Sequence, residues 1–131
     1  MENQNNSQKK KVIILDDDEF LLSMYSAKFT SSGIEVDTAE TGEKLIEMLR
    51  GGATADLLLL DIIIPGLSGL ETLSKIRELG LAKDSKVVML TNQSTEEDVD
   101  KSKTLGVHGY IVKAMSTPSE VVEQVTKIMN N

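Results

Sequence analysis

The chain has 131 residues and a formal net charge of −7, a length that suits a single domain. It contains no cysteine and one histidine, which excludes disulfides, thiolate or multi-histidine metal sites and thiol catalysis. The negative charge argues against binding to nucleic acid or an anionic membrane surface, and no apolar run approaches the ~18 residues that span a membrane. We expect a cytoplasmic protein, with residues 1–10 as a disordered lead-in to a domain over residues 11–131.

Short apolar runs alternate with longer amphipathic runs along the chain. In chain order they predict strand 11–15, helix 18–32, strand 34–38, helix 41–50, strand 57–60, helix 68–79, strand 86–90, helix 94–105, strand 110–112 and helix 117–129. Five consecutive β/α units are typical of the α/β class. The sequence therefore predicts a single doubly wound, five-stranded parallel sheet with helices on both faces.

Several segments carry a clear burial pattern. The strand over 57–60 is uniformly apolar, which predicts burial on both faces of the sheet. The helix over 68–79 is expected to point Leu70, Leu73, Ile76 and Leu79 inward. The inward face of the last helix is expected to consist of Val121, Val122, Val125, Ile128 and Met129.

Two helices carry start signals. The last helix begins with Thr117 as N-cap, Pro118 at the first helical position and Glu120 completing a capping box. The helix before it is expected to open with a capping box formed by Ser94 and Glu97. That helix has few apolar residues, so we expect it to be the least firmly packed of the five.

Acidic side chains follow two of the predicted strands. Asp16 and Asp17 come directly after the first strand, and Asp61 follows the third. Because the carboxyl ends of parallel strands share one edge of the sheet, where open α/β sheets bind their ligands, we expect one acidic cluster. A pair of like charges ~4 Å apart costs roughly 4 kcal/mol at an effective dielectric of ~20. The cluster therefore predicts either a bound cation, for which Mg²⁺ suits the oxygen ligands, or raised pKa values.

Thr91 and Lys113 follow the fourth and fifth strands, so the same edge is expected to hold them too. Each residue type has a plausible task there. Asp61 can act as a carboxylate nucleophile that forms an acyl phosphate. The hydroxyl of Thr91 and the ammonium group of Lys113 can donate to the charge that spreads over a transferring phosphoryl group.

Four stretches of the sequence resemble the receiver domain of bacterial response regulators, in its single-domain, chemotaxis-type form. They are residues 12–17, VIILDD; residues 60–69, LDIIIPGLSG; residues 88–91, VMLT; and residues 109–113, GYIVK. The resemblance covers about residues 11–130 and includes all the predicted strand ends. It implies a flavodoxin-like fold with strand order 2-1-3-4-5.

By that resemblance, Asp61 accepts a phosphoryl group from a phosphohistidine on a sensor histidine kinase or a phosphotransfer protein. Asp16 and Asp17 hold Mg²⁺ together with Asp61 and the main-chain carbonyl of Ile63. Thr91 and Lys113 each bond an oxygen of the phosphoryl group. The chain is then not an enzyme with an external substrate, since it catalyses only its own phosphorylation and dephosphorylation.

The resemblance also implies a switch. Tyr110 is the aromatic residue that moves inward when Thr91 shifts, and the face made by the last two helices and the strand between them changes shape. That face exchanges protein partners, with a downstream target that the sequence does not identify. The resemblance leaves open whether phosphorylation makes a monomeric chain dimerise through this face.

The sequence departs from the family pattern at four positions. Ala114 stands after Lys113 where a proline, usually preceded by a cis bond, is common; a cis bond before alanine costs ~2.5–4 kcal/mol. Asn92 follows Thr91 where a small residue is usual, which narrows access to Asp61. Ile63 stands where the family often has a polar residue, and with Gln93 it is expected to affect how fast water reaches the acyl phosphate. Ser68 precedes Gly69 in place of a frequent acidic residue or asparagine.

Two other functions compete with phosphorylation-dependent signalling. One is a degenerate receiver that docks to its partners whether or not it is phosphorylated. The other is a Mg²⁺-dependent phosphatase with an aspartyl intermediate, which needs a second aspartate two residues after the nucleophile, where this chain has Ile63. Asp18 is expected to serve as a helix cap or as an acidic residue of the first helical turn.

Overall fold

Five strands and five α-helices alternate in the computed structural model, which describes residues 9–92 and 95–131. The elements are β1 (Lys11–Leu15), α1 (Glu19–Ser31), β2 (Glu35–Ala39), α2 (Gly42–Arg50), β3 (Leu57–Asp61), α3 (Gly69–Glu78), β4 (Lys86–Thr91), α4 (Glu96–Thr104), β5 (Gly109–Val112), the short 3₁₀ helix η2 (Lys113–Met115) and α5 (Pro118–Asn130). The lead-in expected over residues 1–10 lies almost wholly outside the described residues.

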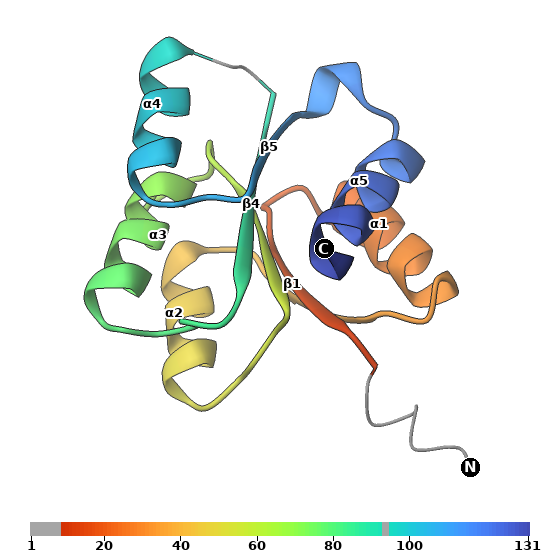
Figure 1. Cartoon of the computed structure of the whole chain (residues 1–131), viewed down its shortest axis with the longest axis horizontal. Coiled ribbons are helices and arrows are strands. Elements are labelled where there is room, and N and C mark those ends of the chain that lie inside the picture. The colour runs from red at the N-terminus through yellow and green to blue at the C-terminus, as the bar shows by residue number, and fades with distance from the viewer. Residues whose placement is uncertain (1–8, 93–94) are drawn as a thin grey trace.

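The strands form one parallel sheet in the order β2-β1-β3-β4-β5. Helices α1 and α5 cover one face of the sheet, and α2, α3 and α4 cover the other (Figure 1). The predicted fold class and strand order are therefore confirmed. No helix in the described part of the chain is long and apolar enough to cross a membrane.

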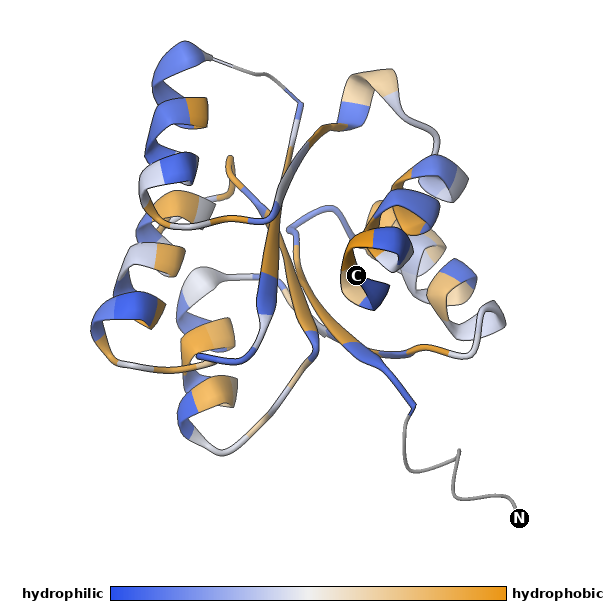
Figure 2. Cartoon of the chain, in the orientation of Figure 1, coloured by the Kyte–Doolittle hydropathy of each residue, from blue (hydrophilic) through white to orange (hydrophobic). Residues whose placement is uncertain are grey.

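The core consists of two apolar layers separated by the sheet. Alternate residues of β1 face opposite sides: Val12 and Ile14 pack towards α1 and α5, while Ile13 and Leu15 pack towards α2 and α3. The four leucines of β3 are all fully buried, as their uniform apolarity predicted. Figure 2 shows this concentration of apolar residues in the central strands. The rigid sheet fixes the positions of the residues that follow its strands.

Side-chain caps define where the helices begin. Asp18 caps α1 by accepting a hydrogen bond from the backbone N–H of Leu21 (3.1 Å), as expected. The capping box of Thr117 and Glu120 at the start of α5 is also confirmed. Several predicted helices included their N-cap residue, which is not itself helical. The first strand matches its prediction. Strands β3 and β4 each end one residue later than predicted, because pairing runs on into Asp61 and Thr91, while β5 begins one residue earlier and β2 is shifted by one residue.

The predicted start of α4 was wrong. The helix begins at Glu96, with Thr95 as N-cap accepting from the backbone N–H of Asp98 (3.1 Å), whereas the expected cap, Ser94, lies outside the described residues. Two adjacent hydroxyl residues each precede an acidic first turn, so the pattern alone does not choose between them. The only buried residue of α4 is Ser102. This agrees with the expected weak packing of α4.

One inward position was assigned wrongly. Leu79 is 48% exposed, because α3 ends at Glu78 and this residue lies just past the end. Ile128 of α5 is partly buried and packs against the core, as its inward position predicted. The remaining predicted apolar positions of both helices are buried, so only the end of the covered surface of α3 was misjudged.

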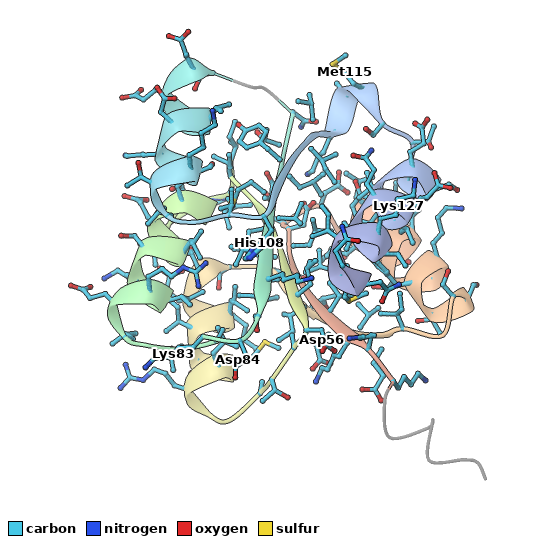
Figure 3. The ribbon with its side chains drawn as sticks, viewed as in Figure 1. Asp56, Lys83, Asp84, His108, Met115 and Lys127 are labelled. Carbon is cyan, nitrogen blue, oxygen red and sulfur yellow. The ribbon has the colours of Figure 1, made fainter. Side chains whose placement is uncertain are left out.

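His108, to which the sequence assigned no role, extends the sheet beside β4 (Figure 3). Its backbone N–H donates to the carbonyl of Val87 (2.7 Å), and its Nδ1 accepts from the backbone N–H of Val87 (3.1 Å). The imidazole therefore accepts a hydrogen bond from the buried backbone N–H of Val87, which lies before the first residue pair of β4 and β5.

Replacing His108 tests this contact. His108→Ala removes the acceptor and should lower the free energy of unfolding by about 1 kcal/mol, measured by urea denaturation. His108→Asn keeps an acceptor, its Oδ1, at the same place and should retain most of the stability. Faster amide hydrogen exchange at Val87 in the alanine variant alone would locate the effect.

Candidate functional site

The carboxyl ends of β1 and β3 bring three aspartates together. Leu15 pairs with Leu60, so Asp16 and Asp61 follow side by side on neighbouring strands. Asp16 is fully buried and Asp61 is 4% exposed, while Asp17 is exposed to solvent. One carboxylate oxygen of each residue lies within 4.8 Å of those of the other two. The predicted acidic cluster is therefore present.

Lys113 lies between the two buried carboxylates. It is the first residue of η2, directly after β5, and its side chain is 6% exposed. Its Nζ lies 2.8 Å from Oδ2 of Asp16 and 2.8 Å from Oδ2 of Asp61. A charge-assisted contact of this length is among the stronger polar interactions in proteins. The lysine thus joins the ends of β1, β3 and β5.

The other carboxylate oxygens are held by the backbone. Oδ1 of Asp16 accepts from the N–H of Asp18 (2.9 Å), and Oδ1 of Asp61 accepts from the N–H of Ile63 (3.1 Å). A carboxylate has about four lone-pair sites, and these contacts use two on each residue. Both side chains are therefore fixed in orientation and can still accept further bonds.

The site contains more negative than positive charge. Burial raises the pKa of Asp61, the hydrogen bond and charge of Lys113 lower it, the charge of Asp16 raises it, and the net shift is upward. Burial lowers the pKa of Lys113, but the hydrogen bonds with the two carboxylates and their negative charges together outweigh this effect and raise that pKa overall. Three carboxylates face one ammonium group. The site therefore favours an additional positive charge.

The donor set fits a hard divalent cation. Carboxylate oxygens with spare lone pairs are ligands that Mg²⁺ prefers, and the exposed Asp17 leaves one side open for the water molecules that Mg²⁺ keeps. The main-chain carbonyl of Ile63 belongs to the short loop directly after Asp61. The chain therefore offers the kind of ligands that its sequence predicted for a magnesium site.

Thr91 and Tyr110 lie on the two strands next to this cluster. Thr91 is buried at the end of β4, one residue beyond Leu90, which pairs with Asp61. Tyr110 is half-buried in β5, opposite Met89. Thr91 thus shares the edge with the aspartates, while Tyr110 lies further back along the sheet. Its part in a switch stays a prediction.

The departures from the family pattern have clear structural consequences. The described residues contain no cis peptide bond, so Ala114 follows Lys113 through a trans bond within η2. Ser68 caps α3 in a full capping box with Glu71, which explains why serine is accepted there. Asn92 and Ile63 are exposed, and Gln93 lies outside the described residues.

Two structural features near Asp61 were not foreseen from the sequence. Gly69, the first residue of α3, lies so close to the end of β3 that a Cβ there would come 2.1 Å from the carbonyl oxygen of Asp61. The phenol of Tyr25, in α1, is almost fully buried; burial raises its pKa, and the charges of Lys113 and Asp16 also act on it. Neither proximity has a local sequence signal, because each depends on how a helix packs on the sheet.

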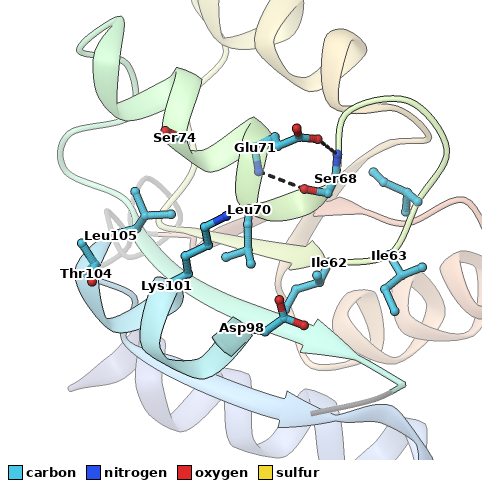
Figure 4. A pocket seen from close by; sticks show the side chains of 11 residues that line it. Ile62, Ile63, Ser68, Leu70, Glu71, Ser74, Asp98, Lys101, Thr104 and Leu105 are labelled. Carbon is cyan, nitrogen blue, oxygen red and sulfur yellow. Dashed lines mark hydrogen bonds between the residues drawn. The ribbon is translucent and has the colours of Figure 1, made fainter. Parts of the chain in front are cut away.

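A groove of about 710 Å³ adjoins the site between α3 and α4 (Figure 4). One wall is the segment 62–64, directly after Asp61, and the opposite wall carries Lys101 and Leu105 of α4. Its complete lining is Ile62, Ile63, Ile64, Ser68, Leu70, Glu71, Ser74, Asp98, Lys101, Thr104 and Leu105. The groove places weakly packed α4 next to the loop that follows the candidate phosphoacceptor.

Comparisons with known proteins agree on one family. The family model of the response regulator receiver domain matches residues 12–126. The chemotaxis protein CheY of Treponema pallidum is 35% identical over 102 residues, which cover 76% of this chain and 69% of that protein. The nitrate/nitrite response regulator protein NarL of Escherichia coli is 40% identical over 80 residues, which cover 61% of this chain and 36% of NarL. A solved CheY-like receiver domain protein from Methanospirillum hungatei superposes with a TM-score of 0.84 at 26% identity, covering 93% of this chain and 94% of that one.

The chain therefore belongs to the response regulator receiver domain family. This confirms the resemblance predicted from the four strand-end stretches. The chain is a receiver domain of two-component signalling, a family whose standard role is to take a phosphoryl group from a kinase. The aligned part spans about a third of the length of NarL.

The electrostatics of Asp61 predict that Asp61→Asn stabilises the fold. A raised pKa means that the folded state disfavours the ionised carboxylate, so its charge costs stability above the folded pKa and costs nothing below the unfolded one. The variant should melt several degrees higher than wild type at pH 7 without divalent cations, and the gain should shrink as the pH falls towards about 4.

Asp84→Asn is the matched control, because Asp84 is an exposed aspartate at the opposite end of the sheet (Figure 3). Calorimetry should show that Asp84→Asn melts at the same temperature as wild type, both at pH 7 and at about pH 4. A lower melting temperature for Asp61→Asn at pH 7 would show that the Lys113 pair outweighs the cost of burial.

Proposed function

We propose that this receiver domain, extending over residues 11–131, accepts a phosphoryl group on Asp61 in a Mg²⁺-dependent reaction and thereby switches its protein partners. The donor is a phosphohistidine on a sensor histidine kinase or a phosphotransfer protein, and the setting is the cytoplasm. The observation that carries the proposal is the 2.8 Å contact of Lys113 Nζ with the carboxylates of both Asp16 and Asp61. It puts a fixed positive charge beside the buried carboxylate of Asp61, and the segment that follows this residue forms one wall of the groove.

The side chains divide the work of the transfer. A carboxylate oxygen of Asp61 forms the new bond to phosphorus while the bond from phosphorus to the imidazole nitrogen breaks, and the electron pair stays on the imidazole. Lys113 and the hydroxyl of Thr91 donate to the phosphoryl oxygens, whose charge is largest during transfer. Mg²⁺, held by Asp16, Asp17, Asp61 and the carbonyl of Ile63, would neutralise part of the same charge.

Phosphorylation then changes what Lys113 and Thr91 contact. A phosphoryl group adds a charge of about −1.5 to −2, which competes with Asp16 for the ammonium group of Lys113. A shift of Thr91 would let Tyr110 move inward and would alter the face made by α4, β5 and α5. The weak burial of α4 supports this element as the movable one, because switching elements come from the less stable parts of a fold.

A Mg²⁺-dependent phosphatase is disfavoured by Ile63, whose side chain is 59% exposed and has no proton to give to a leaving group. The chain is accordingly not an enzyme with external substrates. A receiver that docks to its partners without phosphorylation remains the competing function, and it predicts no response to Mg²⁺ or to phosphodonors.

Phosphorylation by a small donor tests the function directly. With acetyl phosphate and Mg²⁺, the wild-type chain should gain one phosphoryl group, detected by intact-protein mass spectrometry or a phosphate-affinity gel. Asp61→Asn should gain none, and omission of Mg²⁺ should strongly slow the reaction. Asp84→Asn should behave as wild type, and a wild-type chain that stays unmodified would support constitutive docking instead.

Metal binding is testable without any phosphodonor. Mg²⁺ at about 100 times its dissociation constant should stabilise the fold by roughly 2.7 kcal/mol, which corresponds to a rise of several degrees in melting temperature. Asp17→Asn should reduce that rise, and because Asp17 is exposed the variant should fold normally. An unchanged melting temperature in millimolar Mg²⁺ would count against the metal site.

A further inference from the structure

The groove between α3 and α4 takes no part in the proposed phosphoryl transfer, yet it has the features of a small-ligand site. Its volume of about 710 Å³ lies within the range of about 300–1,000 Å³ that ligand pockets occupy. Its apolar lining includes Ile62, Ile64 and Leu70, which are all buried, and the half-buried Leu105. Pockets that bind small molecules combine such an apolar lining with a few polar groups that fix the orientation of the ligand.

A side chain of α3 holds the two helices of the groove together at one end. Nε of Arg77 donates to the carbonyl of Leu105 (3.2 Å), and its Nη2 donates to the carbonyl of Gly106 (3.5 Å). These carbonyls lie at the C-terminal end of α4, where helix carbonyls lack partners within the helix. The guanidinium group therefore fixes that end of α4 against α3, and it adds positive charge there.

Lys101 is the basic residue that lines the groove. It lies in the last turn of α4, and Figure 4 shows its side chain reaching towards α3. Among the described residues, its ammonium group has no ion-pair partner.

The acidic residues of the lining lie at the end of the groove nearer the aspartate cluster. Asp98 lies one turn before Lys101 on α4, beside Ile62 (Figure 4). The carboxylate of Glu71, in the first turn of α3, accepts from the backbone N–H of Ser68 (2.9 Å). The groove is therefore acidic at the end next to the aspartate cluster and basic further along α4.

We propose that this groove binds a small carboxylate ligand, with an apolar body against the buried isoleucines and leucine and its carboxylate on Lys101. The charges fix the direction of the ligand, because the acidic end repels its carboxylate while Lys101 and the nearby Arg77 attract it. The size of the groove favours a small molecule, since 11 residues line it, whereas a protein interface uses about 20–30 residues on each partner. The inference concerns binding alone and does not depend on phosphorylation of Asp61.

A second groove, between α1 and α5, offers an internal comparison. Two lysines, Lys28 and Lys127, also line it, but Val122 is the only apolar residue among the described residues of its lining. A ligand held by charge alone should prefer the groove between α1 and α5. A ligand that needs both a cation and an apolar surface should prefer the groove between α3 and α4.

Two probes of opposite charge test the proposal. Naphthoate carries one carboxylate on an apolar ring system, and naphthylmethylammonium carries a cation on the same ring system. Each is titrated into the isotope-labelled full chain at neutral pH, and backbone amide shifts in NMR spectra locate the binding. Lys101→Glu is the test variant. Lys103→Glu is the matched control, because Lys103 is an exposed residue of the same last turn and does not line the groove.

Naphthoate should saturably shift the amides of Leu70, Ser74, Lys101 and Leu105, with a dissociation constant on the order of 1 mM or lower. Naphthylmethylammonium should bind there at least about threefold more weakly. Lys101→Glu should weaken naphthoate binding at least about threefold, while Lys103→Glu should bind naphthoate as wild type does. Thermal melting should show that both variants are folded.

The proposal is wrong if both probes bind the groove equally, if the two variants lose equal affinity, or if naphthoate shifts the groove between α1 and α5 instead. It is also wrong if naphthoate leaves the amides between α3 and α4 unshifted, a result that would favour a protein segment as the occupant. None of these measurements uses a phosphodonor or Mg²⁺. Their failure would therefore leave the proposed phosphoacceptor role of Asp61 unaffected.

Discussion

The contact of Lys113 with Asp16 and Asp61 is the interaction on which the arrangement of the site depends. Two buried carboxylates on adjacent strands repel each other, and the ammonium group between them compensates part of that repulsion. The same contact joins the ends of three strands that are far apart in the sequence. Because one lysine faces three carboxylates, the compensation is incomplete and the site retains an affinity for positive charge.

The cost of this arrangement is met by the rest of the fold. The residues leading into the site, Leu57 to Leu60, are completely buried, and both apolar layers of the core pack against them. A carboxylate that folding disfavours can persist at the end of such a strand, because removing it from its place would disrupt the core. The proposed phosphoacceptor and the residues that stabilise the core are thus adjacent on one strand.

The sequence predicted the sheet and the aspartate cluster because both depend on local patterns. Apolar runs place strands, and a carboxylate at the end of a parallel strand must lie at a known edge, so Asp16, Asp61 and Lys113 could be brought together before the structure was known. Features that depend on packing could not be predicted from the sequence. They are the acceptor role of His108, the exposure of Leu79, the proximity of Tyr25 to Lys113 and Asp16, and the groove between α3 and α4. The cap of α4 was missed for a different reason, since neighbouring hydroxyl residues give the same signal.

Gly69 shows how closely α3 packs against Asp61, the proposed phosphoacceptor. Its N–H donates to the carbonyl of Ile62 (2.9 Å), and the space where a side chain would project is taken by the carbonyl of Asp61. Evolution at this position is therefore constrained by volume: a single methyl group would separate α3 from the strand that carries the aspartate. A comparison of many homologous sequences would then rank the glycine beside the aspartates of the site, although it contributes no functional group to the proposed reaction.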